Sequence, residues 1–140
     1  MHSSLRGTEI ILVVDDESLV RNLCTAVLTN AGYKVLSAEG GHSALQMFKT
    51  TPSPVHLVLL DVRMPGMSGP ELLFELLDSF EPLNGDIRFL FMSGYPDPDV
   101  GDLAHRGHIQ YSFLRKPFTP SVLLEAVRRE LDVTGHDLCR

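Results

Sequence analysis

Residues 10–17 read Ile-Ile-Leu-Val-Val-Asp-Asp-Glu, an unbroken apolar run that stops at three acidic residues. An apolar run with such sharp ends is typical of a β-strand that is buried on both faces. Over residues 18–30 apolar side chains recur at three- and four-residue spacing, and Ala31-Gly32 ends this pattern as a helix stop does. The beginning of the chain therefore predicts a buried strand followed by a helix.

The alternation of strand and helix continues along the chain. Further strands are predicted at residues 34–38, 55–60, 87–92 and 111–114, and helices at residues 41–50, 72–80, 97–106 and 119–131. Strands that are separated by helical crossovers form a parallel sheet with helices on both faces, so we expect an open, doubly wound α/β fold. A closed barrel would need eight strand–helix pairs, and this chain has five.

The last predicted helix, residues 119–131, has a clear start. Thr119 is the predicted N-cap, and Pro120 occupies the first helical position. Its predicted buried stripe contains the apolar residues at helical spacing, which are Val122, Leu123, Ala126, Val127 and Leu131. We expect one domain over residues 9–132, with tails at residues 1–8 and 133–140.

The length and composition of the chain fit one ordered domain. Of the 140 residues, 44% are hydrophobic, which is enough apolar material for a single core. The net charge of −6 disfavours direct binding of nucleic acid, whose phosphates attract basic surfaces. Cys24 and Cys139 have no disulfide or zinc spacing, and the six histidines are expected to be solvated or in loops. Because no apolar run suits a membrane span or an export signal, we predict no membrane segment and a cytoplasmic location.

Polar residues that can carry chemistry follow the ends of four predicted strands; they are Asp15, Asp16, Asp61, Ser93 and Lys116. Ligands bind outside the carboxyl ends of the strands in an open parallel sheet, so these side chains should converge at one edge. Each residue also has an ordinary explanation, as a helix cap, a turn serine or a solvated lysine. Their coincidence at one edge favours a functional site.

The residue types of this set indicate phosphoryl transfer. Two carboxylates about 4 Å apart repel by roughly 4 kcal/mol at an effective dielectric constant near 20, so a positive charge is needed among them. Oxygen-rich sites of this kind suit Mg²⁺. Asp15 and Asp16 form a natural metal pair, whereas Asp61 stands alone on its strand and is the expected nucleophile. Ser93 and Lys116 would supply the hydroxyl and the ammonium that hold phosphoryl oxygens.

Four segments resemble the receiver, or response-regulator, domains of two-component signalling. They are residues 10–17 quoted above, Leu-Leu-Asp-Val-Arg-Met-Pro-Gly-Met-Ser-Gly at 59–69, Phe-Met-Ser-Gly-Tyr at 91–95 and Phe-Leu-Arg-Lys-Pro-Phe at 113–118. The resemblance covers residues 10–131. It implies a flavodoxin-like (CheY-like) five-stranded sheet with the strand order 2-1-3-4-5.

The resemblance also implies the roles of individual residues. Mg²⁺, or Mn²⁺ in its place, would be held by Asp15, Asp16, Asp61 and the main-chain carbonyl of Arg63. Asp61 would accept a phosphoryl group from a phosphohistidine of a histidine kinase or a phosphotransfer protein, and Ser93 and Lys116 would contact that group. The Lys116–Pro117 peptide bond is expected to be cis. By this resemblance the chain is a phosphoacceptor signalling domain rather than an enzyme, and it promotes its own phosphorylation and dephosphorylation.

A conformational switch is implied as well. It pairs the hydroxyl of Ser93 with the aromatic ring of Phe113, and it changes the surface formed by residues 97–106, 111–114 and 119–131. Phe113 lacks the hydroxyl group of the tyrosine that often occupies this position, so a mechanism based on a tyrosine hydrogen bond is not expected. A homodimer through residues 97–106 and 119–131 is a further expectation.

Two more residues match positions that flank the phosphoryl group in this family, namely Arg63 and Tyr95. We expect them to control the access of water and therefore the lifetime of the acyl phosphate. The test is to compare the dephosphorylation half-lives of Arg63→Ala and Tyr95→Ala with that of the parent protein.

Several alternatives stay open. Residues 7–17 and 91–97 resemble the receiver of hybrid sensor histidine kinases, so the chain is either a single-domain regulator or the receiver of a longer kinase. A haloacid-dehalogenase-like phosphatase also uses a strand-end Asp, a Ser or Thr, a Lys and Mg²⁺, but Asp61-Val62-Arg63 breaks its Asp-x-Asp pattern. A degenerate receiver that binds partners without phosphorylation is the third alternative, although every site position holds a competent residue.

Overall fold

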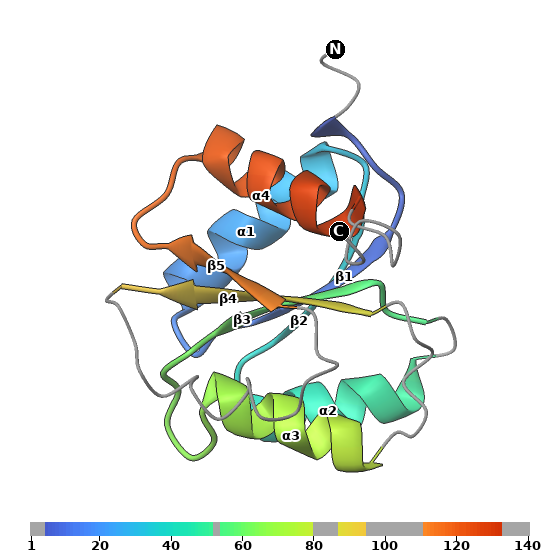
Figure 1. Cartoon of the computed structure of the whole chain (residues 1–140), viewed down its shortest axis with the longest axis vertical. Coiled ribbons are helices and arrows are strands. Elements are labelled where there is room, and N and C mark those ends of the chain that lie inside the picture. Colours follow the sequence, from blue (N-terminus) through green and yellow to red (C-terminus); the bar gives the residue numbers. More distant parts are fainter. Residues whose placement is uncertain (1–4, 52–53, 80–86, 95–110, 133–140) are drawn as a thin grey trace, which may run out of the picture.

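Five parallel strands form one sheet in the order β2-β1-β3-β4-β5. The computed structural model describes residues 5–51, 54–79, 87–94 and 111–132 (Figure 1). The strands are β1 (Ile10–Val14), β2 (Lys34–Ala38), β3 (Leu57–Asp61), β4 (Arg88–Ser93) and β5 (Tyr111–Arg115). The helices are α1 (Ser18–Asn30), α2 (Gly41–Thr50), α3 (Gly69–Ser79) and α4 (Pro120–Asp132). This arrangement confirms the predicted doubly wound fold and its strand order.

Helices cover both faces of the sheet. In Figure 1, α1 and α4 lie on one face, and α2 and α3 lie on the other. Alternate residues of β1 enter the two cores: Ile11 and Val13 pack with the α1 and α4 side, and Leu12 and Val14 pack with the α2 and α3 side. All four side chains are fully buried, which is why the sequence of β1 is an apolar run rather than an alternating one.

The strand register brings the carboxyl ends of the strands to one edge. Val14 of β1 pairs with Leu60 of β3, so Asp15 and Asp61 each follow one residue later on neighbouring strands. Asp61 pairs in turn with Met92 of β4, next to Ser93. The candidate residues therefore share the edge at which open parallel sheets bind ligands.

The third strand lies later in the chain than predicted. It covers Leu57–Asp61 instead of residues 55–60, because the backbone of Asp61 still pairs with Met92. His56, which precedes the strand, was expected to be a solvated or loop residue. It does lie outside the strand, and its part-buried ring accepts at Nδ1 a hydrogen bond of 2.9 Å from the backbone N–H of Ile10.

The helices show where periodicity alone misleads. In α4 the predicted cap is confirmed, since Thr119 Oγ1 accepts a hydrogen bond from the N–H of Val122. Val122 itself was assigned to the buried stripe, and this was wrong: it is 43% exposed, because the buried face of α4 is narrow and centred on Leu123 and Val127. Among the described residues, no helix is long and apolar enough to cross a membrane.

The predicted helix at residues 97–106 lies outside the described residues. Tyr95 also lies outside them. The limits of the domain, residues 9–132, stay a prediction.

Candidate functional site

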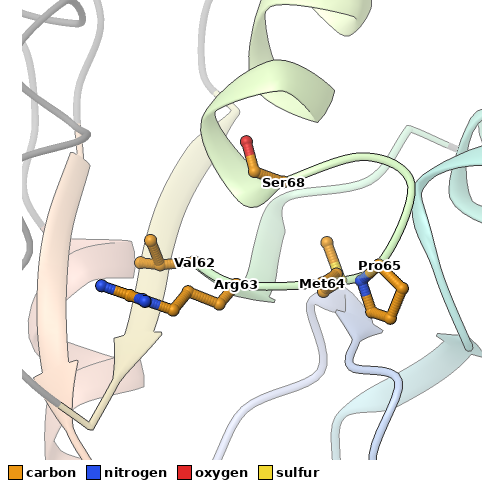
Figure 2. Close-up of a pocket in the computed structure, with 5 residues that line it drawn as sticks. All are labelled: Val62, Arg63, Met64, Pro65 and Ser68. Atoms are coloured by element: carbon orange, nitrogen blue, oxygen red, sulfur yellow. The ribbon is translucent and has the colours of Figure 1, made fainter.

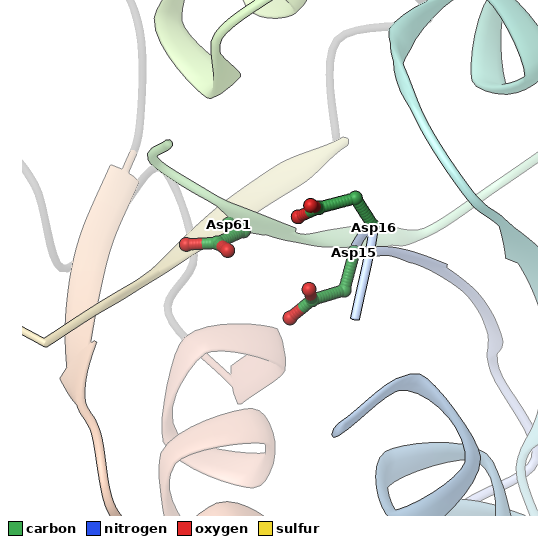
Figure 3. A group of neighbouring side chains, drawn as sticks. All are labelled: Asp15, Asp16 and Asp61. Atoms are coloured by element: carbon green, nitrogen blue, oxygen red, sulfur yellow. The ribbon is translucent and has the colours of Figure 1, made fainter. Parts of the chain in front are cut away.

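Three carboxylates meet at the ends of β1 and β3 (Figure 3). Asp15 and Asp16 follow β1 directly, and Asp61 is the last residue of β3. One oxygen from each of the three lies within 4.8 Å of the others. Asp15 is fully buried and Asp16 is exposed, so the cluster is fixed on one side and open to solvent on the other.

Lys116 brings the one ammonium group that contacts this cluster among the described residues. It follows β5, its peptide bond to Pro117 is cis, and its backbone N–H donates a hydrogen bond of 2.8 Å to the carbonyl of Ser93. The ammonium nitrogen lies 3.2 Å from Oδ2 of Asp15 and 3.3 Å from Oδ2 of Asp61. It therefore bridges the carboxylates of two neighbouring strands.

The charges of the cluster do not balance. Burial raises the pKa of Asp61, with Lys116 opposing this effect and Asp15 adding to it. Burial alone would lower the pKa of Lys116, but the carboxylates of Asp61 and Asp15 together raise it. Lys116 is therefore protonated at neutral pH, and its one ammonium contacts three carboxyl groups, those of Asp15, Asp61 and, at 3.9 Å, Glu17. The excess of negative charge favours binding of a cation.

The donor set of the cluster fits a hard divalent cation. It consists of carboxylate oxygens within 4.8 Å of one another, which are the ligands that Mg²⁺ and Mn²⁺ prefer. The open side at Asp16 leaves room for water or for phosphoryl oxygens, which Mg²⁺ usually keeps as ligands. The chemistry of the residues is thus compatible with the predicted metal.

Ser93 and Phe113 lie on the neighbouring strands β4 and β5. Ser93 ends β4 and is buried. Phe113 is 46% exposed, and its ring stacks on that of Phe91 with a centroid separation of 5.6 Å and an interplanar angle of 28°. Tyr111 packs edge-on against both rings. The aromatic ring predicted to act in the switch thus lies on the outside of the sheet, against a buried partner.

A pocket of about 430 Å³ lies on the loop that follows Asp61 (Figure 2). Its walls are formed by Val62, Arg63, Met64, Pro65 and Ser68. Ser68 caps α3: its Oγ accepts the N–H of Glu71, and its own N–H donates to Glu71 Oε1 over 2.8 Å. The backbone N–H of Arg63 reaches back to Oδ1 of Asp61 over 3.4 Å. The loop beside the candidate nucleophile is therefore fixed at both ends.

Two residues next to the cluster were not predicted from the sequence. Gly69 begins α3 so close to β3 that a Cβ atom there would overlap the main-chain carbonyl of Asp61. Arg21 of α1 donates a hydrogen bond of 2.7 Å from Nη1 to the main-chain carbonyl of Asp15. In the sequence, Gly69 ends the segment 59–69 quoted above, and Arg21 stands in the first turn of a predicted helix. Neither of these sequence features predicts which atoms the residue contacts.

Of the residues predicted for the site, the structure brings Asp15, Asp16, Asp61 and Lys116 together. Ser93 and Phe113 lie on the two strands beside them, and Arg63 lies on the adjoining loop.

Comparison with known proteins agrees with this geometry. The chain is 35% identical over 130 residues to the sensor kinase CckA of Brucella abortus. This match covers 93% of this chain and 13% of the kinase. It is 32% identical to sporulation initiation phosphotransferase F of Bacillus subtilis, with 91% of this chain and 98% of that protein covered. The crystal structure of the receiver domain from the hybrid histidine kinase CckA superposes with a TM-score of 0.71 at 32% identity, covering 88% of this chain and 99% of that domain.

The chain thus spans a small part of one relative and nearly all of the other. The family model of the response regulator receiver domain matches residues 11–128. These residues include all five strands, apart from Ile10, the first residue of β1. With the strand order, the strand-end residues and this match in agreement, the chain belongs to the family of response regulator receiver domains.

Proposed function

We propose that this domain accepts a phosphoryl group on Asp61 from the phosphohistidine of a histidine kinase or a phosphotransfer protein. The observation that carries the proposal is the position of Lys116, whose ammonium contacts the carboxylates of both Asp15 and Asp61. A carboxylate that is partly buried beside a fixed cation is prepared to hold a group that brings further negative charge.

In the proposed step, a carboxylate oxygen of Asp61 attacks the phosphorus atom of the phosphohistidine. The new O–P bond forms as the P–N bond breaks, and the electron pair of the P–N bond stays on the imidazole nitrogen of the donor. The product on this chain is an acyl phosphate. Lys116, already 3.3 Å from Asp61 Oδ2, would pair with a phosphoryl oxygen, and the hydroxyl of Ser93 would donate to another.

The residues proposed to hold Mg²⁺ are Asp15, Asp16, Asp61 and the main-chain carbonyl of Arg63. When bound, the ion would supply the positive charge that offsets the carboxylates and the phosphoryl oxygens. Mn²⁺ accepts the same oxygen ligands and should substitute for it.

We further propose that phosphorylation is read out through Ser93 and Phe113. Phe113 is half exposed and rests on Phe91, so its ring can change position without unfolding the core. A change there would alter the surface formed by β5 and α4. We also keep the proposal that Arg63 and Tyr95 control the lifetime of the acyl phosphate; the side chain of Arg63 lines the pocket beside Asp61.

The helix α1 offers a surface on which the donor protein could bind, because it begins directly after the acidic residues 15–17. Leu19 is 81% exposed and Leu23 is 45% exposed, so two apolar side chains four residues apart on one helix are open to solvent. We propose that they contact the protein that carries the phosphohistidine. The relatives allow two settings for such a donor: transfer within a longer sensor kinase, or transfer to a separate single-domain protein.

The experiment is intact-mass spectrometry after incubation with Mg²⁺ and phosphoramidate. We expect one phosphoryl adduct on the parent protein and none on Asp61→Asn or in the presence of EDTA. Asp78→Asn, which removes an exposed carboxylate from α3, is the matched control and should form the adduct. An adduct on Asp61→Asn would contradict the proposal. A folded parent protein that binds Mg²⁺ but forms no adduct is either a receiver that accepts the group only from its protein donor or a binding module that does not use phosphate.

A further inference from the structure

Asp15 is held by four hydrogen bonds, two to its backbone and two to its side chain. Asp15 is fully buried; its N–H donates to the carbonyl of Ala38 over 3.2 Å, and its Oδ1 accepts the N–H of Glu17 over 2.9 Å. Its Oδ2 accepts from Lys116. The main-chain carbonyl completes the set, because it accepts the guanidinium of Arg21 over 2.7 Å. This last contact is the shortest of the four and involves a full charge.

The place of Arg21 in α1 is unfavourable for the helix itself. A cation in the first turn opposes the helix dipole. The N-cap residue Glu17 makes no side-chain cap, and the acidic residues at this end precede α1 rather than stand in its first turn. Stabilisation of α1 therefore does not explain the arginine at this position, whereas its contact with the carbonyl of Asp15 does.

We infer that Arg21 is a positioning residue for the carboxylate pair of Asp15 and Asp16. Its guanidinium fixes the plane of the peptide group between the two aspartates, and that plane sets the direction in which Asp16 leaves the end of β1. Asp16 is exposed, so the turn holds its carboxylate in place more than packing does. The inference rests on the proposed role of the pair in holding Mg²⁺, and it gives Arg21 the task of keeping the pair aligned before the ion binds.

A simple electrostatic role for Arg21 predicts the opposite behaviour. A positive charge beside a cation site repels the cation, so removal of the charge alone would strengthen binding of Mg²⁺. If Arg21 orients the pair, its removal weakens binding although a repelling charge has gone. The sign of the change separates the two roles.

The test is isothermal titration calorimetry of Mg²⁺ on the full chain. We expect Arg21→Ala to raise the Kd about tenfold, as the loss of groups that orient metal ligands typically does. Arg21→Lys should recover most of the affinity, because one N–H donor suffices for the bond to the carbonyl. Arg129→Ala removes the same charge from an exposed position on α4 and should leave the Kd unchanged.

Urea denaturation in EDTA shows whether each variant is folded. Arg21→Met keeps much of the side-chain packing without a donor, so it replaces Arg21→Ala if the latter unfolds. Binding by Arg21→Met or Arg21→Ala that is as tight as in the parent protein, or tighter, overturns the inference. A parent protein that does not bind Mg²⁺ at all contradicts the proposed function instead, and the two failures are thus distinguishable.

Discussion

The ammonium of Lys116 lies 3.3 Å from Oδ2 of Asp61, at the end of the central strand β3. The same group contacts Asp15, which has no exposure to solvent. Removal of Lys116 would leave a buried carboxylate without a cation. In EDTA we expect Lys116→Met to lower the free energy of unfolding by roughly 2 kcal/mol, since the lysine is itself partly solvated.

Urea denaturation of Lys116→Met, with and without Mg²⁺, checks this prediction. The divalent ion should restore part of the loss, because it supplies positive charge to the same carboxylates. Lys49→Met, on an exposed position of α2, is the control and should lose little. Equal losses in the two variants would show that Lys116 does not neutralise the cluster.

Gly69 allows α3 to begin against the backbone of Asp61. A Cβ atom at this position would overlap the carbonyl of Asp61 and lie 3.1 Å from the ring of Phe91. We expect Gly69→Ala to cost about 2 kcal/mol of stability and to slow phosphorylation, because the strand end that holds Asp61 must shift. At Gly94, where no atom of the described residues lies within 4 Å of an added Cβ, the same substitution should be neutral. Denaturation and the rate of adduct formation measure the two effects, and a neutral Gly69→Ala contradicts the prediction.

Arg128 of α4 and Glu9 form an ion pair with N–O distances of 2.7 and 3.3 Å. The hydrogen bond from Arg128 lowers the pKa of Glu9 below its ordinary value of 4.5, although burial opposes the shift. The stabilisation is therefore fully present above that ordinary value, and it disappears as the pH falls through the lower pKa of the folded state.

We expect Glu9→Gln to be less stable than the parent protein by about 1 kcal/mol at neutral pH and nearly equal once the pH lies below the lowered pKa of Glu9 in the folded state. Urea denaturation across this pH range measures the difference. Glu125→Gln, on the exposed side of α4, provides the comparison. A stability gap for Glu9→Gln that does not change with pH would show that the ion pair is not its cause.

His56 supplies the hydrogen-bond acceptor for the first residue of β1. Its Nδ1 lies 2.9 Å from the backbone nitrogen of Ile10, and asparagine can place Oδ1 in nearly the same position. We expect His56→Ala to lose about 1–2 kcal/mol by leaving this N–H unsatisfied, and His56→Asn to lose clearly less. Thermal denaturation of both variants, with His42→Ala on the exposed side of α2 as control, decides the matter. If asparagine rescues nothing, the ring of His56 acts through packing and not through Nδ1.

The strand β1 shows how much the sequence alone can predict. Its apolar run predicted burial on both faces, and Ile11 to Val14 are fully buried. Because parallel strands share one carboxyl edge, the residues that follow them were predicted to meet, and the contacts of Lys116 with Asp15 and Asp61 confirm this convergence. The roles of these residues in phosphoryl transfer stay proposals.

Exposure on the helices was harder to predict. Hydrophobic periodicity shows which residues share a face, but it does not show how much of that face another element covers. Val122 was therefore predicted to be buried although it is 43% exposed. Leu19 likewise fits the apolar spacing of α1 although it is largely exposed.

The amino-acid sequence by itself determined the doubly wound fold class, the edge of the sheet where the site lies and the residue types gathered there, because strand periodicity and chain connectivity are local and directional properties. The strand order was implied by the resemblance to receiver domains. Only the tertiary structure decided that Arg21 reaches the carbonyl of Asp15, that Gly69 must lack a side chain and that His56 completes the start of β1. The contacts of Arg21 and His56 join their side chains to main-chain atoms 6 and 46 positions away in the sequence. The requirement at Gly69 depends on the space between α3 and β3. No pattern of residue types encodes such distances before the chain is folded.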